Sequence, residues 1–447
     1  MFKIYHFANS FISVKSNNSI LTCDPWIGKT NDNGWCSYPI IDTKKINKEI
    51  FKSDFVYISH LHCDHLDFKT LAKFKNKKMK FVIKKFPNPT LKNRLKRFFK
   101  NKIIEIEPFK EKKLNNELSV AIIPQILGNS DNLEDNIQYD MDTSILIYSK
   151  KYNKVFYNNV DNSINFKILK KINSFAKKTF KNEIDIFTCG LGAASEYPQA
   201  FLNINRKYEK KLIIEKSLKD IKKYINYLKP KIYFPSGGTY TIYGKYSNLN
   251  RYIAQPSFTE IFKTLKNSKT KVYNLIGGNS LMINNSNSYV DKSKFQENKK
   301  FKENFILKTK KIKYYYKLKS NLINLKKLDF LFANATDNYK NILKKFNINP
   351  NWIINFKIFK NLEISKNCYI NKKKSSLLKV YKIGNIKSNH SKIPKLECYL
   401  EYDLFYSLLK RKFPWNTSLS GSTIMFKRYP NKFYPDMVYS LNFLGSK

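Results

Sequence analysis

Apolar and polar residues alternate in short runs at the start of the chain, and this pattern predicts strands. Three such runs cover residues 2–7, 10–14 and 19–23, with Asn or Ser residues that favour turns between them. The third run ends at Asp24-Pro25-Trp26, where the proline has no N–H to donate to a sheet. We therefore expect an antiparallel meander over the first 24 residues.

Strand and helix patterns then interleave along the chain. A buried-strand pattern lies at 55–59, and others follow at 80–83, 103–106, 118–123, 144–148, 155–157 and 231–234. Helical patterns lie near 68–74, 90–99, 163–172 and 216–228. This alternation predicts an α/β (α+β) fold with two sheets flanked by helices.

The chain of 447 residues is long enough for two domains. Residues 291–313 are rich in Lys and Asn and have few apolar anchors, as in a linker. We expect a larger domain over residues 1–290 and a smaller α+β unit over residues 314–447.

The loop after the buried strand at 55–59 carries the clearest chemistry. Three of the five histidines fall in the run His60-Leu61-His62-Cys63-Asp64-His65. His60 and His62 point to the same side of an extended backbone, and a turn can bring Asp64 and His65 back toward them. Imidazole and carboxylate groups suit zinc, iron or manganese. The pattern predicts a metal site, and the alternative is a solvated polar loop.

Asp161 is a further candidate ligand, because it follows the strand pattern at 155–157 and should also lie at a strand exit. From position alone, a turn or helix N-cap role is equally compatible with it.

Composition narrows the choice of partners. The formal charge of +49 comes from 83 Lys and Arg against 34 Asp and Glu, yet only six of the basic residues are Arg. Lys and Asn are abundant throughout, as in a genome with AT-rich codons, whereas specific base recognition relies on Arg. We expect no nucleic-acid partner and a general attraction for anionic small molecules.

The sequence lacks the patterns that mark membrane-spanning and secreted proteins. No apolar stretch reaches the roughly 18–20 residues that a membrane span needs, and the N-terminus shows no signal-peptide pattern. The six cysteines are scattered, as in a reducing compartment. We expect a cytoplasmic protein without a transmembrane segment.

The order His-x-His-x-Asp-His after a strand, with Asp24-Pro25-Trp26 before it, resembles the metallo-β-lactamase fold. The resemblance implies an αββα sandwich with a metal site at one sheet edge. It also implies that Asp161 is the later carboxylate ligand, which often bridges two metals.

A series of smaller motifs resembles a narrower family, CMP-N-acetylneuraminate hydroxylase and UDP-N-acetylmuramate hydroxylase without their Rieske part. The motifs occur in order and extend over most of the chain: Cys23-Asp24-Pro25-Trp26, Gly34-Trp35, Met141-Asp142-Thr143-Ser144, Asn159-Val160-Asp161, Gly190-Leu191-Gly192-Ala193-Ala194-Ser195, Pro235-Ser236-Gly237-Gly238 and Phe426-Lys427-Arg428-Tyr429-Pro430-Asn431. The resemblance implies action on an N-acylated sugar or sugar nucleotide.

Two departures from that family affect the predicted chemistry. A Rieske centre needs two Cys-x-His pairs, and only Cys63-Asp64-His65 has this spacing. We expect no iron–sulfur cluster in this chain, so that a hydroxylase would need a separate Rieske or reductase protein. The family also has a histidine just before the Met-Asp-Thr motif, where this chain has Gln138, Tyr139 and Asp140.

This ligand set predicts one well-held divalent metal, zinc or iron, rather than two. Asp64, His65 and Asp161 would form one complete set, whereas His60 and His62 would lack a partner unless Asp140, Asp142 or water supplied it. Asp64 is also the candidate catalytic residue, which would orient or deprotonate a water molecule.

Three functions follow from the sequence: a component of a split hydroxylase, a stand-alone hydrolase of a sugar phosphate, ester or lactone, and a non-catalytic sugar-nucleotide-binding protein. Candidate substrate contacts are Gly192, Ser236 and Tyr240. Packing is the alternative role for Gly192 and Tyr240. We expect His6 to be a packed strand-end residue and Asp24 to orient a metal-bound histidine.

Overall fold

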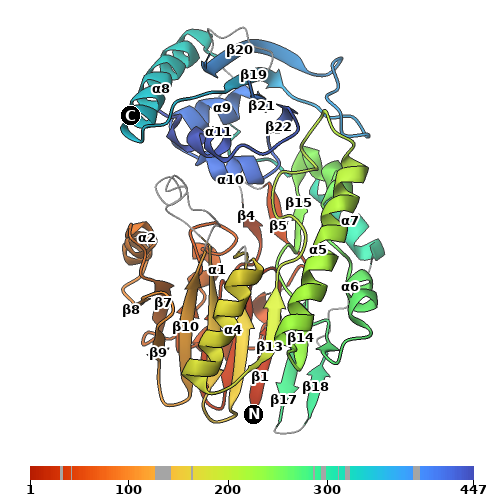
Figure 1. The fold of residues 1–447 in the computed structure, drawn as a ribbon. Coiled ribbons are helices and arrows are strands. Elements are labelled where there is room, and N and C mark those ends of the chain that lie inside the picture. The colour runs from red at the N-terminus through yellow and green to blue at the C-terminus, as the bar shows by residue number, and fades with distance from the viewer. Residues whose placement is uncertain are drawn as a thin grey trace.

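The computed structural model describes residues 1–30, 34–41, 43–125, 142–162, 165–284, 287–292, 299–310, 312–317, 323–385 and 393–446. Two large sheets face each other in the lower half of the molecule as drawn in Figure 1. The first has eight strands in the order β18 (Ser288–Asp291), β17 (Asn279–Ile283), β1 (Phe2–His6), β2 (Ile12–Ser16), β3 (Ser19–Cys23), β6 (Phe55–Tyr57), β7 (Lys80–Lys84) and β8 (Ile103–Ile106).

The second large sheet has seven strands. Their order is β16 (Lys271–Val272), β14 (Ile232–Pro235), β13 (Ile184–Cys189), β12 (Lys154–Asn158), β11 (Thr143–Ser149), β10 (Leu118–Pro124) and β9 (Glu111–Lys113). Alternate residues of the strands, such as Ile4, Val14 and Val120, are fully buried in the core between the two sheets.

Helices cover the outer face of each large sheet. The seven-stranded sheet packs against α4 (Phe166–Phe180), α5 (Arg206–Leu228) and α6 (Phe258–Leu265) through a second apolar cluster. The eight-stranded sheet packs against the short α1 (Phe68–Leu71) and α2 (Thr90–Phe98). These four layers confirm the predicted α/β fold with two sheets flanked by helices.

The predicted strands agree closely with the structure, whereas the ends of two helices differ. The first three strands form the expected antiparallel meander. Helix α4 begins at Phe166 and continues to Phe180, beyond the predicted range of 163–172. Helix α5 begins at Arg206 rather than at 216, because its first half buries little apolar surface and so lacks the periodic stripe that marks a helix.

The C-terminal part of the chain has its own sheet and helices. Its strand order is β20 (Ser376–Gly384), β19 (Ile353–Asn361), β21 (Lys395–Glu401) and β22 (Met425–Tyr429). The helices are α8 (Leu325–Lys345), α9 (Tyr402–Leu409), α10 (Trp415–Ser420) and α11 (Pro435–Tyr439). The predicted linker range contains helix α7 (Lys299–Thr309), and the division into domains stays a prediction.

A third, small sheet connects the sandwich to the C-terminal part. It consists of β15 (Tyr240–Ile242), β5 (Trp35–Ser37) and β4 (Lys29–Thr30). Trp35 and Tyr240 of this sheet belong to the same apolar cluster as Phe356 of β19 and Phe426 of β22. We call this the shared aromatic cluster; it joins residues far apart in the chain.

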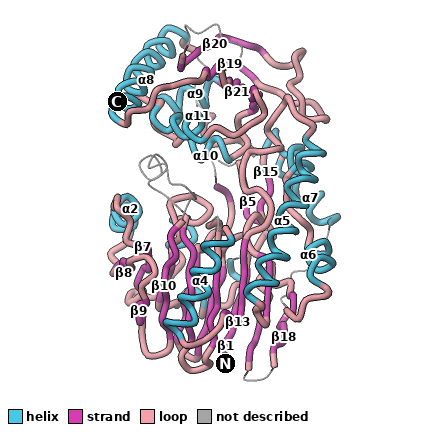
Figure 2. Tube along the Cα trace, in the orientation of Figure 1, coloured by secondary structure: helices cyan, strands magenta, loops and turns pink. Residues whose placement is uncertain are grey.

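Strand direction explains where functional side chains gather. Strands β3, β6 and β7 are parallel to one another, as are β12, β13 and β14, so each group ends at one edge of its sheet. In Figures 1 and 2, these edges face the C-terminal part of the chain. Among the described residues, none of the helices has the length and apolar character that crossing a membrane requires.

Candidate metal centre

The predicted ligands converge at this sheet edge from three places in the sequence. His60, His62 and His65 lie in the loop after β6, and Asp161 lies just beyond the end of β12. Asp142 comes directly before β11, which is antiparallel to β12 and therefore begins where β12 ends. The hydroxyl of Thr143 donates to the Ser59 carbonyl at 2.8 Å and ties the start of β11 to the histidine loop.

The ligand atoms form two overlapping groups. Nε2 of His60 lies 2.7 Å from Nδ1 of His62 and 3.2 Å from Oδ1 of Asp142. Nε2 of His65 lies 3.2 Å from Oδ2 of Asp161. One group is His60, His62 and Asp142, the other is His60, His65 and Asp161, and the ligand atoms within each lie within 4.8 Å of one another.

These residues fit a metal ion. Two imidazole nitrogens and a carboxylate oxygen that face one point are a common donor set for zinc and for non-haem iron. Asp142 joins His60 and His62 in one group, which is one of the possibilities that the sequence raised. Gln138, Tyr139 and Asp140 lie outside the described residues.

Asp64 lies beside the two groups rather than within either. Its Oδ2 accepts a hydrogen bond from Nδ2 of Asn9 at 3.1 Å and is 3.6 Å from Nε2 of His65. Asn9, in the turn between β1 and β2, was not a candidate from the sequence. The predicted catalytic and ligand roles of Asp64 stay predictions.

Asp24 and Ser59 support the histidines from behind. Oδ2 of Asp24 lies 3.1 Å from Nδ1 of His65 and accepts the Ser59 hydroxyl proton at 2.7 Å. Because that proton goes to Asp24, the Ser59 oxygen can accept from Nδ1 of His60, 2.8 Å away. This arrangement leaves Nε2 of His60 free to bind a metal, and Asp24 contacts a histidine as the sequence predicted.

Replacing Ser59 with Ala should weaken metal binding about 10–100-fold, the usual cost of removing such a supporting contact. The Ala variant loses the acceptor that holds the His60 ring, while the buried strand before it is unchanged. Competition with a chromophoric chelator measures the affinity, and Ser59→Thr, which keeps the hydroxyl, serves as the control. Equal affinities for the Ala variant and the unchanged protein would contradict this role.

The pKa values of the two buried histidines, His60 and His65, are shifted in opposite directions. Burial opposes a charge on His65, but the carboxylates of Asp161, Asp64 and Asp24 outweigh it and raise its pKa well above the usual value. Burial, together with the neighbouring His65 and His62, lowers the pKa of His60 well below its usual value. Without a metal, His65 therefore holds the proton, which a bound metal would displace.

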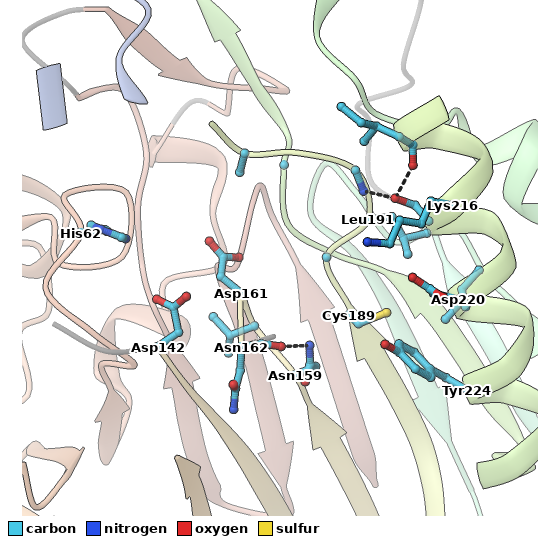
Figure 3. A pocket seen from close by; sticks show the side chains of 18 residues that line it. His62, Asp142, Asn159, Asp161, Asn162, Cys189, Leu191, Lys216, Asp220 and Tyr224 are labelled. Carbon is cyan, nitrogen blue, oxygen red and sulfur yellow. Dashed lines mark hydrogen bonds between the residues drawn. The ribbon is translucent and has the colours of Figure 1, made fainter. Parts of the chain in front are cut away.

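A cavity of about 590 Å³ opens beside Asp161 (Figure 3). Its wall includes His62, Asp142 and Asp161 on one side, Gly190 and Gly192 at the end of β13, and residues of α5 on the other. A volume of this size suits a small molecule. Of the three predicted substrate contacts, Gly192 lines this cavity.

Ser236 and Tyr240 line a neighbouring cavity of about 480 Å³. The Ser236 hydroxyl lies 2.8 Å from that of Thr188, and the Tyr240 ring stacks on Trp35 with centroids 3.9 Å apart. Both side chains are thus engaged within the protein, and their predicted contact with substrate stays a prediction. The structure brings neither of them into the cavity beside Asp161.

Gly192 is held in a conformation that only glycine adopts easily. Its φ is +90°, and a Cβ there would lie 2.2 Å from the Ala254 carbonyl oxygen. Gly192→Ala should therefore destabilise the protein by about 1–3 kcal/mol, measured by denaturant unfolding. Gly190→Ala is the control, because its Cβ would meet nothing closer than 3.5 Å. Similar losses for both variants would contradict the explanation.

His6 takes the predicted packing role at the end of β1. It is fully buried, and its Nε2 lies 2.8 Å from the carbonyl oxygen of Asn9. Burial lowers its pKa to about 4, so that it is neutral at physiological pH.

Comparison with known proteins gives short sequence matches. No protein-family model matches the chain. A 114-residue segment is 28% identical to a Mycobacterium tuberculosis protein named for a Rieske 2Fe-2S iron–sulfur centre, and covers 25% of this chain and 22% of that protein. A 70-residue segment is 36% identical to cytidine monophosphate-N-acetylneuraminic acid hydroxylase of Asterias rubens, and covers 15% of this chain and 11% of that enzyme. The chain thus matches about a fifth or less of these relatives.

Solved structures match over a larger part of the chain. A metallo-hydrolase from Ignicoccus hospitalis has 16% identity and a TM-score of 0.41, with 66% of this chain and 99% of that chain covered. A diiron β-hydroxylase from Streptomyces venezuelae has 13% identity and a TM-score of 0.43, with 63% and 54% covered. A metallo-β-lactamase-fold protein from Bacillus subtilis has 9% identity and a TM-score of 0.39, with 62% and 98% covered. At such identities the likeness concerns the fold alone.

Proposed function

We propose that the chain is a metal-dependent enzyme whose ions are held by His60, His62, His65, Asp142 and Asp161. The observation that carries this proposal is the pair of overlapping groups, each with two histidines and one aspartate, at the wall of a cavity. Such donor sets occur in non-haem iron oxygenases and in zinc hydrolases. A divalent ion in such a set supplies Lewis acidity and, if it is iron, reactivity toward oxygen.

The chain's own residues would prepare the reaction. Asp24 contacts the His65 ring and Ser59 contacts the His60 ring, and these contacts hold the two rings. We infer that Asp64 orients a nucleophile or accepts its proton, and the support is that the amide of Asn9 holds one of its carboxylate oxygens beside the ligand groups.

For the substrate, we propose an N-acylated sugar or sugar nucleotide that is hydroxylated with electrons from a separate Rieske or reductase protein. The support is the series of sequence motifs shared with that family and the match to the Asterias rubens hydroxylase. The name of the Mycobacterium tuberculosis relative is in keeping with a Rieske partner. The alternative is a stand-alone hydrolase, because two histidines and a carboxylate also bind catalytic zinc.

One experiment separates these chemistries. The metal-loaded chain is incubated with CMP-N-acetylneuraminate or UDP-N-acetylmuramate, with and without oxygen and a chemical reductant, and products are identified by mass spectrometry. A product with one added oxygen, formed only when both are present, supports the hydroxylase. Cleavage of the substrate without oxygen would contradict the hydroxylase and support the hydrolase. Binding without turnover would indicate a non-catalytic protein.

A further inference from the structure

One face of α5 forms the cavity wall opposite the candidate ligands. Lys216, Asp220 and Tyr224 are spaced four residues apart, which places them above one another on a helix, and all three line the cavity. Figure 3 shows Asp220 and Tyr224 extending from α5 toward Cys189, across from Asp142 and Asp161. These residues carry no distinctive sequence signal, because Lys is abundant throughout this chain.

The charged groups of this face are not paired with each other. No ion pair or hydrogen bond joins Lys216 or Asp220 to another of the residues that the structure describes, although the two are one turn apart. One turn earlier on the same helix, Lys211 and Glu215 do form an ion pair, at 3.7 Å. An unpaired carboxylate is notable in a chain with 83 basic and 34 acidic residues. Both groups are therefore available to a molecule in the cavity.

The three side chains lie at different depths in the cavity. Lys216 is exposed, whereas Asp220 and Tyr224 are half-buried. Burial and the nearby Asp220 carboxylate raise the pKa of Tyr224 to about 12, so that its phenol stays neutral. The cavity thus offers a cation near its mouth, and a carboxylate and a phenol deeper inside.

The loop after β13 is fastened to this face. The Gly192 N–H donates to the Ser217 hydroxyl at 3.1 Å, and that hydroxyl donates in turn to the Ile213 carbonyl at 2.9 Å. Since Gly192 also borders the cavity, this contact fixes the distance between the strand ends and α5. The α5 face is a fixed wall of the same site that holds the candidate ligands.

We propose that Lys216 and Asp220 determine specificity for an acidic sugar. Lys216 pairs with a carboxylate or phosphate of the substrate, and Asp220 accepts hydrogen bonds from its hydroxyl or amide N–H groups. This inference rests on the proposed function, because it assigns the substrate class of the same site.

Calorimetric titration tests the inference by binding alone. The probes are N-acetylneuraminate for a carboxylate, N-acetylglucosamine 6-phosphate for a phosphate, and neutral N-acetylglucosamine. We expect one of the two anionic probes to bind about tenfold or more tightly than the neutral probe, as for a charge-assisted contact. Which anionic probe binds better identifies the acidic group.

Variants separate this contact from the general positive charge of the chain. Lys216→Gln should reduce the affinity for the anionic probe to that for the neutral one, whereas Asp220→Asn should weaken all three. Lys219→Gln and Glu215→Gln are the matched controls, because both residues are exposed on α5 and do not line the cavity. They should change none of the affinities.

Three results would overturn the inference: equal effects of Lys216→Gln and Lys219→Gln, no effect of Asp220→Asn, or no binding of any probe. Metal content is measured on the same samples. A chain that binds the probes as expected but holds no metal would refute the proposed enzyme and retain the sugar site. If the metal-loaded chain turns over substrate equally well with Lys216→Gln or Asp220→Asn, the proposed enzyme is supported and the role of these two residues is refuted.

Discussion

His60→Ala should remove nearly all of the bound metal and reduce any turnover to background. His60 is the one residue that belongs to both ligand groups, so its loss leaves each group with two donors. The affinity for the metal should fall further than the loss of about 10–100-fold that follows removal of a supporting contact. Elemental analysis of the purified protein, without added chelator, gives the metal content per chain.

Cys63→Ala is the control for this experiment. Cys63 lies in the same loop and is half-buried, yet it is in neither ligand group. The control should keep its metal, and both variants should keep the far-ultraviolet circular dichroism of the unchanged protein. If both variants lost metal equally, distortion of the loop rather than loss of a ligand would be responsible.

Asp142→Ala should weaken metal binding without abolishing it. In the unchanged protein Asp142 completes the group with His60 and His62, and its loss leaves the group with His60, His65 and Asp161 intact. The sequence predicted one metal because no third histidine was present. Because the two groups share His60 and one imidazole nitrogen binds one ion, the number of ions stays a prediction.

The variant Asp142→His distinguishes a ligand from a structural residue, because imidazole replaces one metal donor with another. It should restore the metal affinity, whereas Asp142→Asn, which is closer in shape, should bind the ion only weakly. Equal metal affinities for Asp142→Ala and the unchanged protein, measured by competition with a chelator, would contradict a ligand role for Asp142.

The sandwich was predictable because its signals are local. The strands before residue 24 alternate with period two, and one proline marks the end of the third. By contrast, β17 was not predicted. It pairs with β1, from which it is separated by most of the first 290 residues of the sequence. Pairing between distant segments leaves no trace in the sequence of either segment.

The candidate site was predictable to the extent that its residues are close in sequence. The three histidines of the loop stand out because histidine is rare in this chain, whereas Ser59 and Asn9 are of common types. Ser59 acts through contacts with Asp24 and two histidines, and these depend on the parallel pairing of β3 with β6. Position after a strand suggested Asp24 and Asp161, and the geometry of β11 was needed to place Asp142.

The shared aromatic cluster has a consequence for how this chain can be divided by evolution or by protein engineering. Trp35 and Tyr240 lie in the small sheet beside the sandwich, and they are buried together with Phe356 and Phe426 from the C-terminal sheet. A chain that ended near residue 313 would lack Phe356 and Phe426, expose the rings of Trp35 and Tyr240 to water, and aggregate. Gene fusion or recombination should therefore transfer both parts together, as a single heritable unit.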